Sequence, residues 1–147
     1  MRLPEFQARQ LLAAARVARL ASVDQASRPH IVPVTFVLDG DRIYSAVDAK
    51  PKTTRSLHRL RNIRANPRVA LLADHFDEDW TALWWVRADG HAQIVEEPRQ
   101  MARPVELLTA RYAQYRETPP TGPVIAVRVD RWSGWAGSAA ASVTVET

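Results

Sequence analysis

Short runs of apolar and β-branched residues, separated by turn signals, predict strands along most of the chain. Two dipeptides, Asp39-Gly40 and Asp89-Gly90, are typical of hairpin turns, because both residue types accept the positive φ angles of a type I′ turn. We therefore expect a hairpin at each of them. The expected strands cover residues 17–23, 30–38, 42–47, 69–73, 83–95 with its turn at Asp89-Gly90, and 124–131.

Helical segments interrupt these strands. A short helix is expected over residues 3–15, which carry apolar side chains at helical spacing. A second helix is expected between Asp48 and Pro67, because Asn66-Pro67 disfavours a continued helical backbone. Helical segments over residues 98–115 are expected to break at Pro104, which lacks an N–H group.

Strands joined by hairpins, without an alternating βαβ rhythm, predict a mainly β, antiparallel barrel with accessory helices and argue against a Rossmann domain. A chain of 147 residues has the size of one domain. No apolar run approaches the roughly 18 residues of a membrane span, and residues 1–9 lack a secretory signal, so we expect a cytoplasmic protein. The single domain 1–147 is divided into an N-terminal helix (3–15), a barrel core (16–96), a helical segment with the last strand (97–131) and a tail (132–147).

Residues 50–68, KPKTTRSLHRLRNIRANPR, form a strongly basic segment without an acidic residue. Lys50 and Lys52 are the only lysines of the chain, and they precede a helix that Thr53 or Thr54 opens. Ammonium groups and the free N–H groups of a helix start can converge on one phosphate, so we interpret this junction as an anion site. For the remaining basic residues of the helix, a solvated face is the preferred interpretation: Arg59, Arg61 and Arg64.

Other chemistry-bearing residues give weaker signals. The chain has no cysteine, and its four histidines (His30, His58, His75 and His91) lack metal-ligand spacing, so we expect no metal site. We assign no catalytic acid or base. Tryptophan bodies hide a large area, so Trp80 is expected to be structural, whereas the consecutive Trp84 and Trp85 should face opposite sides of a strand. Trp132 and Trp135 fit a pocket wall and an aromatic packing corner equally well.

The stretch 16–95 contains RVARLASVD, SRPHIVPVTFVLDGDRIYSAVDAKPKTTRSLHRLRNIRANPRVALLADHF and WWVRADGHAQIV. This order resembles the pyridoxamine 5′-phosphate oxidase-like superfamily, and within it the actinobacterial branch that uses the deazaflavin coenzyme F420. The resemblance implies an FMN-binding split β-barrel whose core, 16–96, holds the cofactor at the subunit interface of a homodimer.

The same resemblance assigns site residues. The cofactor phosphate would be held by Lys50 and Lys52 with Thr53, and two strand segments, Pro33, Val34 and Thr35 and also Ser45, Ala46 and Val47, would lie along the ring. Trp84 and Trp85 of the second subunit would cover the cofactor. Arg55 and Arg59 would meet the polyglutamate tail of the deazaflavin, since a multiply anionic tail profits from a positive field. Pro51 stands where members that bind flavin mononucleotide (FMN) often have arginine, which weakens an FMN assignment.

The preferred function is an F420-dependent oxidoreductase that transfers a hydride between reduced deazaflavin and an unidentified small organic substrate. One alternative keeps the fold but uses FMN as cofactor in an oxidase or reductase. Another is a cofactor carrier that binds without turnover. Nucleic-acid binding, prompted by the net charge of +4, ranks last, because acidic residues between Asp74 and Asp79 interrupt the positive field.

Overall fold

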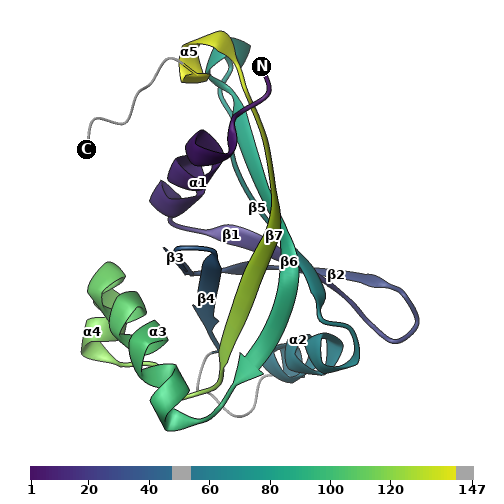
Figure 1. The fold of residues 1–147 in the computed structure, drawn as a ribbon, viewed down its shortest axis with the longest axis vertical. Coiled ribbons are helices and arrows are strands. Elements are labelled where there is room, and N and C mark those ends of the chain that lie inside the picture. Colours follow the sequence, from purple (N-terminus) through teal and green to yellow (C-terminus); the bar gives the residue numbers. More distant parts are fainter. Residues whose placement is uncertain (48–53, 142–147) are drawn as a thin grey trace.

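Seven strands form one antiparallel sheet in the order β2-β1-β5-β6-β7-β4-β3 (Figure 1). The computed structural model describes residues 1–47 and 54–141, with the backbone alone for 54–57. The strands are β1 (Ala18–Val23), β2 (Pro29–Val34), β3 (Val37–Asp39), β4 (Arg42–Ala46), β5 (Arg68–His75), β6 (Trp84–Val95) and β7 (Val124–Ala136). The helices are α1 (Glu5–Ala14), α2 (Thr54–Ala65), α3 (Pro98–Arg111), α4 (Ala113–Glu117) and α5 (Ser138–Ala141), with a 3₁₀ turn, η1 (Trp80–Ala82).

The two edge strands of the sheet, β2 and β3, follow each other in the chain. Only Thr35 and Phe36 separate them, so the sheet must curl until its two edges approach each other at this crossing. No ladder within the described ranges joins β2 to β3, and the curled sheet therefore stays open along one seam. This arrangement confirms the predicted mainly β split barrel.

The core fills the inside of the curled sheet. Side chains alternate between its two faces, and every second residue is buried in β1, from Val69 to Ala73 in β5 and from Val86 to Ala92 in β6. Phe36, at the crossing, is fully buried together with Leu20 and Ile43. Leu12 of α1 and Leu108 of α3 close the core from the helical side. Each such side chain stabilises the fold by about 1.5–3 kcal/mol relative to exposure.

β6 and β7 form the longest ladder of the sheet, and the second predicted hairpin is wrong. β6 continues straight through Asp89 and Gly90, where the register against β7 shifts. A Cβ atom on Gly90 would lie 2.2 Å from the carbonyl oxygen of Arg128. This glycine therefore permits a close approach of two strands at a β-bulge, and it makes no turn.

The first predicted hairpin is confirmed, with a different centre. Asp39 pairs with Arg42, so the two loop residues are Gly40 and Asp41. In this hairpin only Gly40 has a positive φ, of 61°. A glycine with positive φ at the first central position is the signature of a type II′ turn, so the expected type I′ turn is corrected.

Three element boundaries also differ from the predictions. α3 continues through Pro104 and ends before Tyr112, because one proline removes only one hydrogen bond from a well-packed helix and its ring is buried here. The predicted strand 30–38 divides into β2 and β3 at the crossing. β7 does not end at Arg131 but extends to Ala136, paired with β6.

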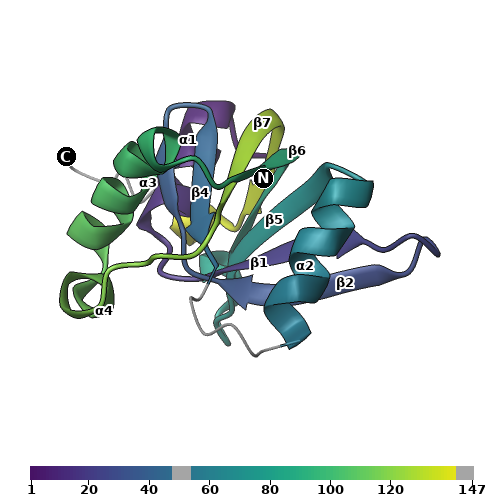
Figure 2. The same cartoon turned by 90° about the horizontal axis from the view of Figure 1, so that it is seen from below.

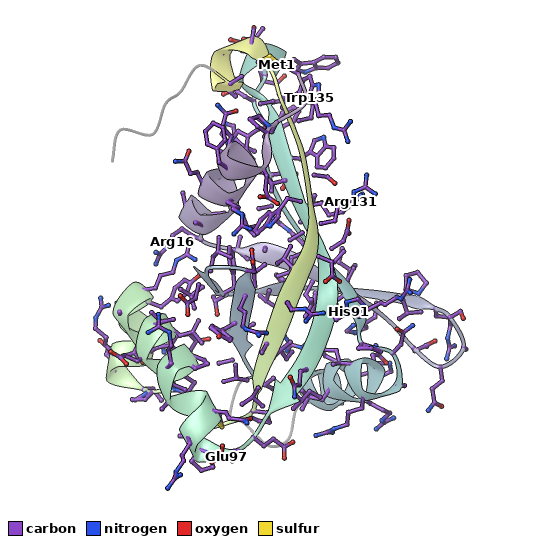
Figure 3. The ribbon with its side chains drawn as sticks, viewed as in Figure 1. Met1, Arg16, His91, Glu97, Arg131 and Trp135 are labelled. Carbon is purple, nitrogen blue, oxygen red and sulfur yellow. The ribbon has the colours of Figure 1, made fainter. Side chains whose placement is uncertain are left out.

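The start of the chain lies beside the far end of β7. The N-terminal ammonium of Met1 donates to the carbonyl oxygen of Ala136 at 2.9 Å. The backbone of Arg2 forms an isolated antiparallel β-bridge with Trp135. Figure 3 shows Met1 and Trp135 together at this end, far from Glu97 at the other. Across residues 1–47 and 54–141, no helix has the length and apolar character needed to cross a membrane.

Candidate functional site

A cleft of about 560 Å³ lies where the end of β2, the end of β4, α2 and α4 meet. Figure 2 shows α2 and the pair α3–α4 on opposite sides of β4. A cleft of this volume has the size of a small-molecule site. The lining residues are Pro33, Val34, Thr35, Ser45, Ala46, Val47, Arg59, Gln114, Tyr115, Thr118, Pro119 and Pro120.

Thr35 connects the two strand walls of this cleft with its helical wall. The helical wall consists of residues from α4 and the segment after it: Gln114, Tyr115, Thr118, Pro119 and Pro120. The hydroxyl of Ser45 donates to the backbone oxygen of Thr35 at 2.8 Å, which ties β4 to the crossing. The side-chain hydroxyl of Thr35 lies 2.8 Å from the hydroxyl of Tyr115. Three segments that are distant in the sequence are thus held around one cleft.

Arg59 brings a positive charge into the cleft from α2. Its side chain is half-buried, and its Nε atom is fully covered and has no hydrogen-bond partner among the described residues. Burial lowers the pKa of Arg59, an effect that nearby Tyr115 opposes. The predicted solvated face is therefore wrong for Arg59, whereas Arg64 is exposed and pairs with Glu96 at 2.7 Å. A half-buried guanidinium that lines a cleft is a ready partner for an anionic or carbonyl oxygen.

A network at the crossing fixes the helical wall. The hydroxyl of Tyr112 accepts from the N–H of Phe36 at 3.1 Å and lies within donating distance of the backbone oxygens of Phe36 and Arg16. The guanidinium of Arg111 donates to the same Phe36 oxygen at 2.7 Å and lies over the Phe36 ring. Burial lowers the pKa of Arg111. The start of α4 is thereby held in place next to the cleft.

The structure brings together some of the predicted site residues and separates others. The two predicted strand segments, Pro33 to Thr35 and Ser45 to Val47, line the same cleft. Lys50, Lys52 and Thr53 lie outside the described residues, between Val47 of the cleft and the start of α2, and Arg55 is described by its backbone alone.

Trp84 and Trp85 lie away from this cleft, on opposite faces of β6 as predicted. Trp84 packs against the core, whereas Trp85 is exposed on the outer face of the sheet. A second cleft of about 530 Å³ crosses this outer face. It is lined by Arg19, Ala21, Ile31, Ala70, Leu72, Asp74, Trp85 and Arg87.

Sequence reasoning missed the helical wall and misread Arg59, which was expected on a solvated face. Trp80, for which a structural role is expected, is 70% exposed in the single chain. Arg59 lies four residues before the buried Ile63, and this spacing places it at the border of the apolar side of α2. That spacing was a usable signal. Nothing local in the sequence marks the helical wall, which consists of Gln114, Tyr115, Thr118, Pro119 and Pro120.

Among the described lining residues, the cleft combines apolar walls with one cation, Arg59. Among its described lining residues none is acidic and none is a histidine, so Arg59 is the charged group there. Within the described ranges, no three His, Asp or Glu side chains gather as a possible metal site. The arrangement suits a flat ligand with a negative charge or several oxygen atoms, held by hydroxyl groups and a guanidinium.

The sheet is a split barrel, and the cleft near its open seam is a candidate small-molecule site. A family model described as pyridoxamine 5′-phosphate oxidase matches residues 5–136. The chain therefore belongs to the pyridoxamine 5′-phosphate oxidase family. Among curated proteins, no sequence match is found.

Solved structures of similar fold cover almost the whole chain. The conserved hypothetical protein Rv2991 from Mycobacterium tuberculosis is 19% identical with a TM-score of 0.75, over 99% of this chain and 91% of that one. A FAD-binding protein from Mesorhizobium loti is 18% identical with a TM-score of 0.72, over 91% and 95%. HutZ, the heme storage protein from Vibrio cholerae, is 15% identical with a TM-score of 0.69, over 90% and 93%. At these identities the likeness establishes the fold.

Proposed function

We propose that this protein is a cytoplasmic, homodimeric oxidoreductase that binds the deazaflavin coenzyme F420 in the cleft beside Arg59. One observation carries the proposal: the half-buried guanidinium of Arg59 lines a cleft together with Pro33 to Thr35 and Ser45 to Val47. These strand segments are the ones that the family resemblance assigns to the cofactor ring. The FAD-binding protein from Mesorhizobium loti has the same fold, which supports a flavin-like ligand.

The residues present fit such a cofactor. Pro33 and Ala46 offer apolar surface to a flat ring system, and Val34 and Val47 are buried in the core beside the cleft. Arg59 offers charge-assisted hydrogen bonds to the electron-rich edge of the ring or to a phosphate. Lys50, Lys52 and Thr53 follow Val47 in the sequence, and we assign them to the cofactor phosphate.

When bound, the cofactor supplies the hydride chemistry, and the residues of the chain supply binding and orientation. The apolar strand walls exclude water from one ring face. Ser45, tied to Thr35 at 2.8 Å, keeps β4 and the crossing at a fixed separation, so the width of the cleft is set before a ligand enters. Such preorganisation reduces the entropy lost on binding.

We further propose that the outer face of β1, β2, β5 and β6 forms the dimer interface. Ile31 is 63% exposed there and lies in the second cleft with Leu72 and Trp85. Exposed apolar side chains gathered on one face, with charged Arg19, Asp74 and Arg87 around them, have the composition of an interface. Trp85 of each subunit would thus reach the partner subunit.

A non-catalytic cofactor carrier is the second candidate function. It is favoured by the absence of any carboxylate or imidazole among the described lining residues of the cleft. HutZ, which has a similar fold, is a heme storage protein. An FMN enzyme is the other alternative, and it differs from the preferred function only in the cofactor.

Titration of the purified protein with tailed F420, tail-less deazaflavin and FMN tests the proposal. We expect the tightest binding for F420, and Arg59→Gln should weaken it by roughly 10- to 100-fold, the effect of losing one charge-assisted hydrogen bond. Arg64→Gln is the matched control on the same helix, because its side chain is exposed and pairs with Glu96.

The outcomes separate the candidates. A preference for FMN would replace F420 as cofactor. Tight F420 binding without oxidation of the reduced form by any of a panel of organic acceptors would favour the carrier. Failure of the wild-type protein to bind any of the three ligands would overturn the proposal.

A further inference from the structure

We propose that α4 and the residues after it form the substrate wall of the cleft, and that the Tyr115 hydroxyl binds an oxygen atom of a neutral or anionic substrate. This inference rests on the proposed function, because it presumes that the strand side of the cleft holds the cofactor. The wall consists of Gln114, Tyr115, Thr118, Pro119 and Pro120.

The cleft has two chemically different sides. The strand side carries the segments Pro33 to Thr35 and Ser45 to Val47, which present mainly apolar side chains. The helical side presents an amide, a phenol and a threonine hydroxyl, followed by two prolines. A flat cofactor against the strands would leave the polar helical side to face whatever lies over the ring. Polar groups that converge on an otherwise apolar cleft fix the orientation of a ligand.

Tyr115 is held in a defined position. Its hydroxyl lies 2.8 Å from the hydroxyl of Thr35, and its ring packs edge-on against Tyr112, with ring centroids 5.7 Å apart at 81°. Tyr112 is in turn fastened to the crossing through the N–H of Phe36. When Thr35 donates to Tyr115, the phenolic proton remains available to a ligand. A rigid donor of this kind binds a carbonyl or carboxylate oxygen with little loss of entropy.

The charge of the cleft selects the substrate further. Arg59 lies close enough to Tyr115 for the two groups to interact, and no described lining residue is acidic. A cationic substrate would find no carboxylate to pair with among the described lining residues, and partial burial makes an unpaired charge costly. The cleft therefore favours planar substrates that carry a carbonyl or carboxylate group and disfavours amines.

Three small probes of similar size test this selection: benzoate, benzamide and benzylamine. Each probe is titrated into the protein after the protein has been loaded with the cofactor that it binds most tightly. We expect benzoate and benzamide to bind at least about tenfold more tightly than benzylamine. Binding of benzylamine as tight as that of benzoate would overturn the assignment of the substrate class.

Tyr115→Phe tests the contact itself, because it removes one hydroxyl and keeps the ring that packs on Tyr112. We expect benzoate and benzamide to lose about tenfold in affinity, while cofactor affinity changes by less than about twofold. Tyr44→Phe is the control, since Tyr44 lies on β4 and is not among the lining residues of the cleft. If cofactor affinity falls as much as probe affinity, Tyr115 contacts the cofactor and the inference is overturned. Unchanged affinity for the probes would also overturn the inference.

Thr35→Val is a second variant that leaves the phenol intact and removes the hydroxyl that positions it. If Thr35→Val weakens the binding of benzoate and benzamide, but by less than Tyr115→Phe does, Thr35 positions Tyr115. If Thr35→Val leaves the affinity for these probes unchanged, Thr35 does not position Tyr115. The cofactor-free protein separates this inference from the proposed function. If no flavin or deazaflavin binds but benzoate still binds in a Tyr115-dependent way, the proposed cofactor fails and the oxygen-binding wall stands.

Discussion

The N–H of Phe36 donates to the phenol oxygen of Tyr112 at 3.1 Å, which joins the residue at the strand crossing to the residue between α3 and α4. Both residues are buried, so the hydrogen bond has no water to replace it. The same contact determines where the helical wall of the cleft stands relative to its strand wall.

Tyr112→Phe should therefore lower the free energy of unfolding by about 1–3 kcal/mol, because it leaves a buried N–H without a partner. Urea denaturation measures the change. Tyr44→Phe, at a half-buried position with no side-chain hydrogen bond in the described structure, should stay within about 0.5 kcal/mol of the wild type. Equal stability of the two variants would contradict the assigned role of Tyr112.

The stability of the protein should fall as the pH drops below neutrality, because of His30. This ring stacks on His58 with centroids 5.2 Å apart, and its Nδ1 is buried without a partner among the described residues. Burial lowers the pKa of His30 from 6.5, and the nearby His58 and Arg59 lower it further, against an opposing effect of Asp24.

The sign follows from proton binding. A histidine with a lowered pKa binds its proton more weakly in the folded than in the unfolded state. The contribution of neutral His30 to the free energy of unfolding is therefore fully present above pH 6.5, the unfolded value, and is lost as the pH falls through the lowered pKa of the folded state. Thermal unfolding between pH 7.5 and 5 should show a smaller fall for His30→Phe than for the wild type. An unchanged slope in His30→Phe would rule His30 out as the source.

Replacing Gly90 or Gly40 with alanine should lower the free energy of unfolding, for a different reason at each position. Gly90→Ala places a Cβ atom 2.2 Å from the Arg128 oxygen, so strands β6 and β7 must separate, and we expect a loss of at least about 3 kcal/mol. Gly40→Ala meets open space and only the unfavourable φ of 61°, so a loss of about 1–2 kcal/mol is expected. Denaturation curves of both variants test this order, and a reversed order would refute the bulge interpretation.

The proposed dimer gives a prediction for the outer face of the sheet. Leu72→Asp introduces a charge into the second cleft beside Trp85 and should convert the dimer to a monomer in analytical ultracentrifugation. Arg99→Asp, at the exposed start of α3, should leave the association unchanged. A wild-type protein that sediments as a monomer at micromolar concentration would refute the proposed interface.

Local patterns predicted most strands and helices, and they failed where the same signal serves two structures. Asp39-Gly40 and Asp89-Gly90 have the same local chemistry, yet only the first stands at a hairpin. The second lies between long strands that pair across β6 and β7, and this long-range pairing decides the conformation of Gly90. No local property of the dipeptide carries that information.

The same limit applies to the cleft. Resemblance to a family placed Pro33 to Thr35 and Ser45 to Val47 at a shared ligand, and the structure gathers them around one cleft. Tyr115 joins them through a contact to Thr35 across 80 positions of sequence. Because α4 packs according to tertiary contacts, its residues stay invisible to reasoning from periodicity.

The register of β2 has a consequence for how the protein behaves in concentrated solution. The N–H of Asp24 donates to the Arg28 oxygen at 3.0 Å, so the backbone groups of Pro29, Ile31 and Pro33 point away from β1, toward the outer edge of the sheet. Proline has no N–H, and this edge therefore offers a single donor, from Ile31, over five residues. An incoming strand from another molecule finds too few hydrogen bonds to attach there, which protects an exposed sheet edge against aggregation.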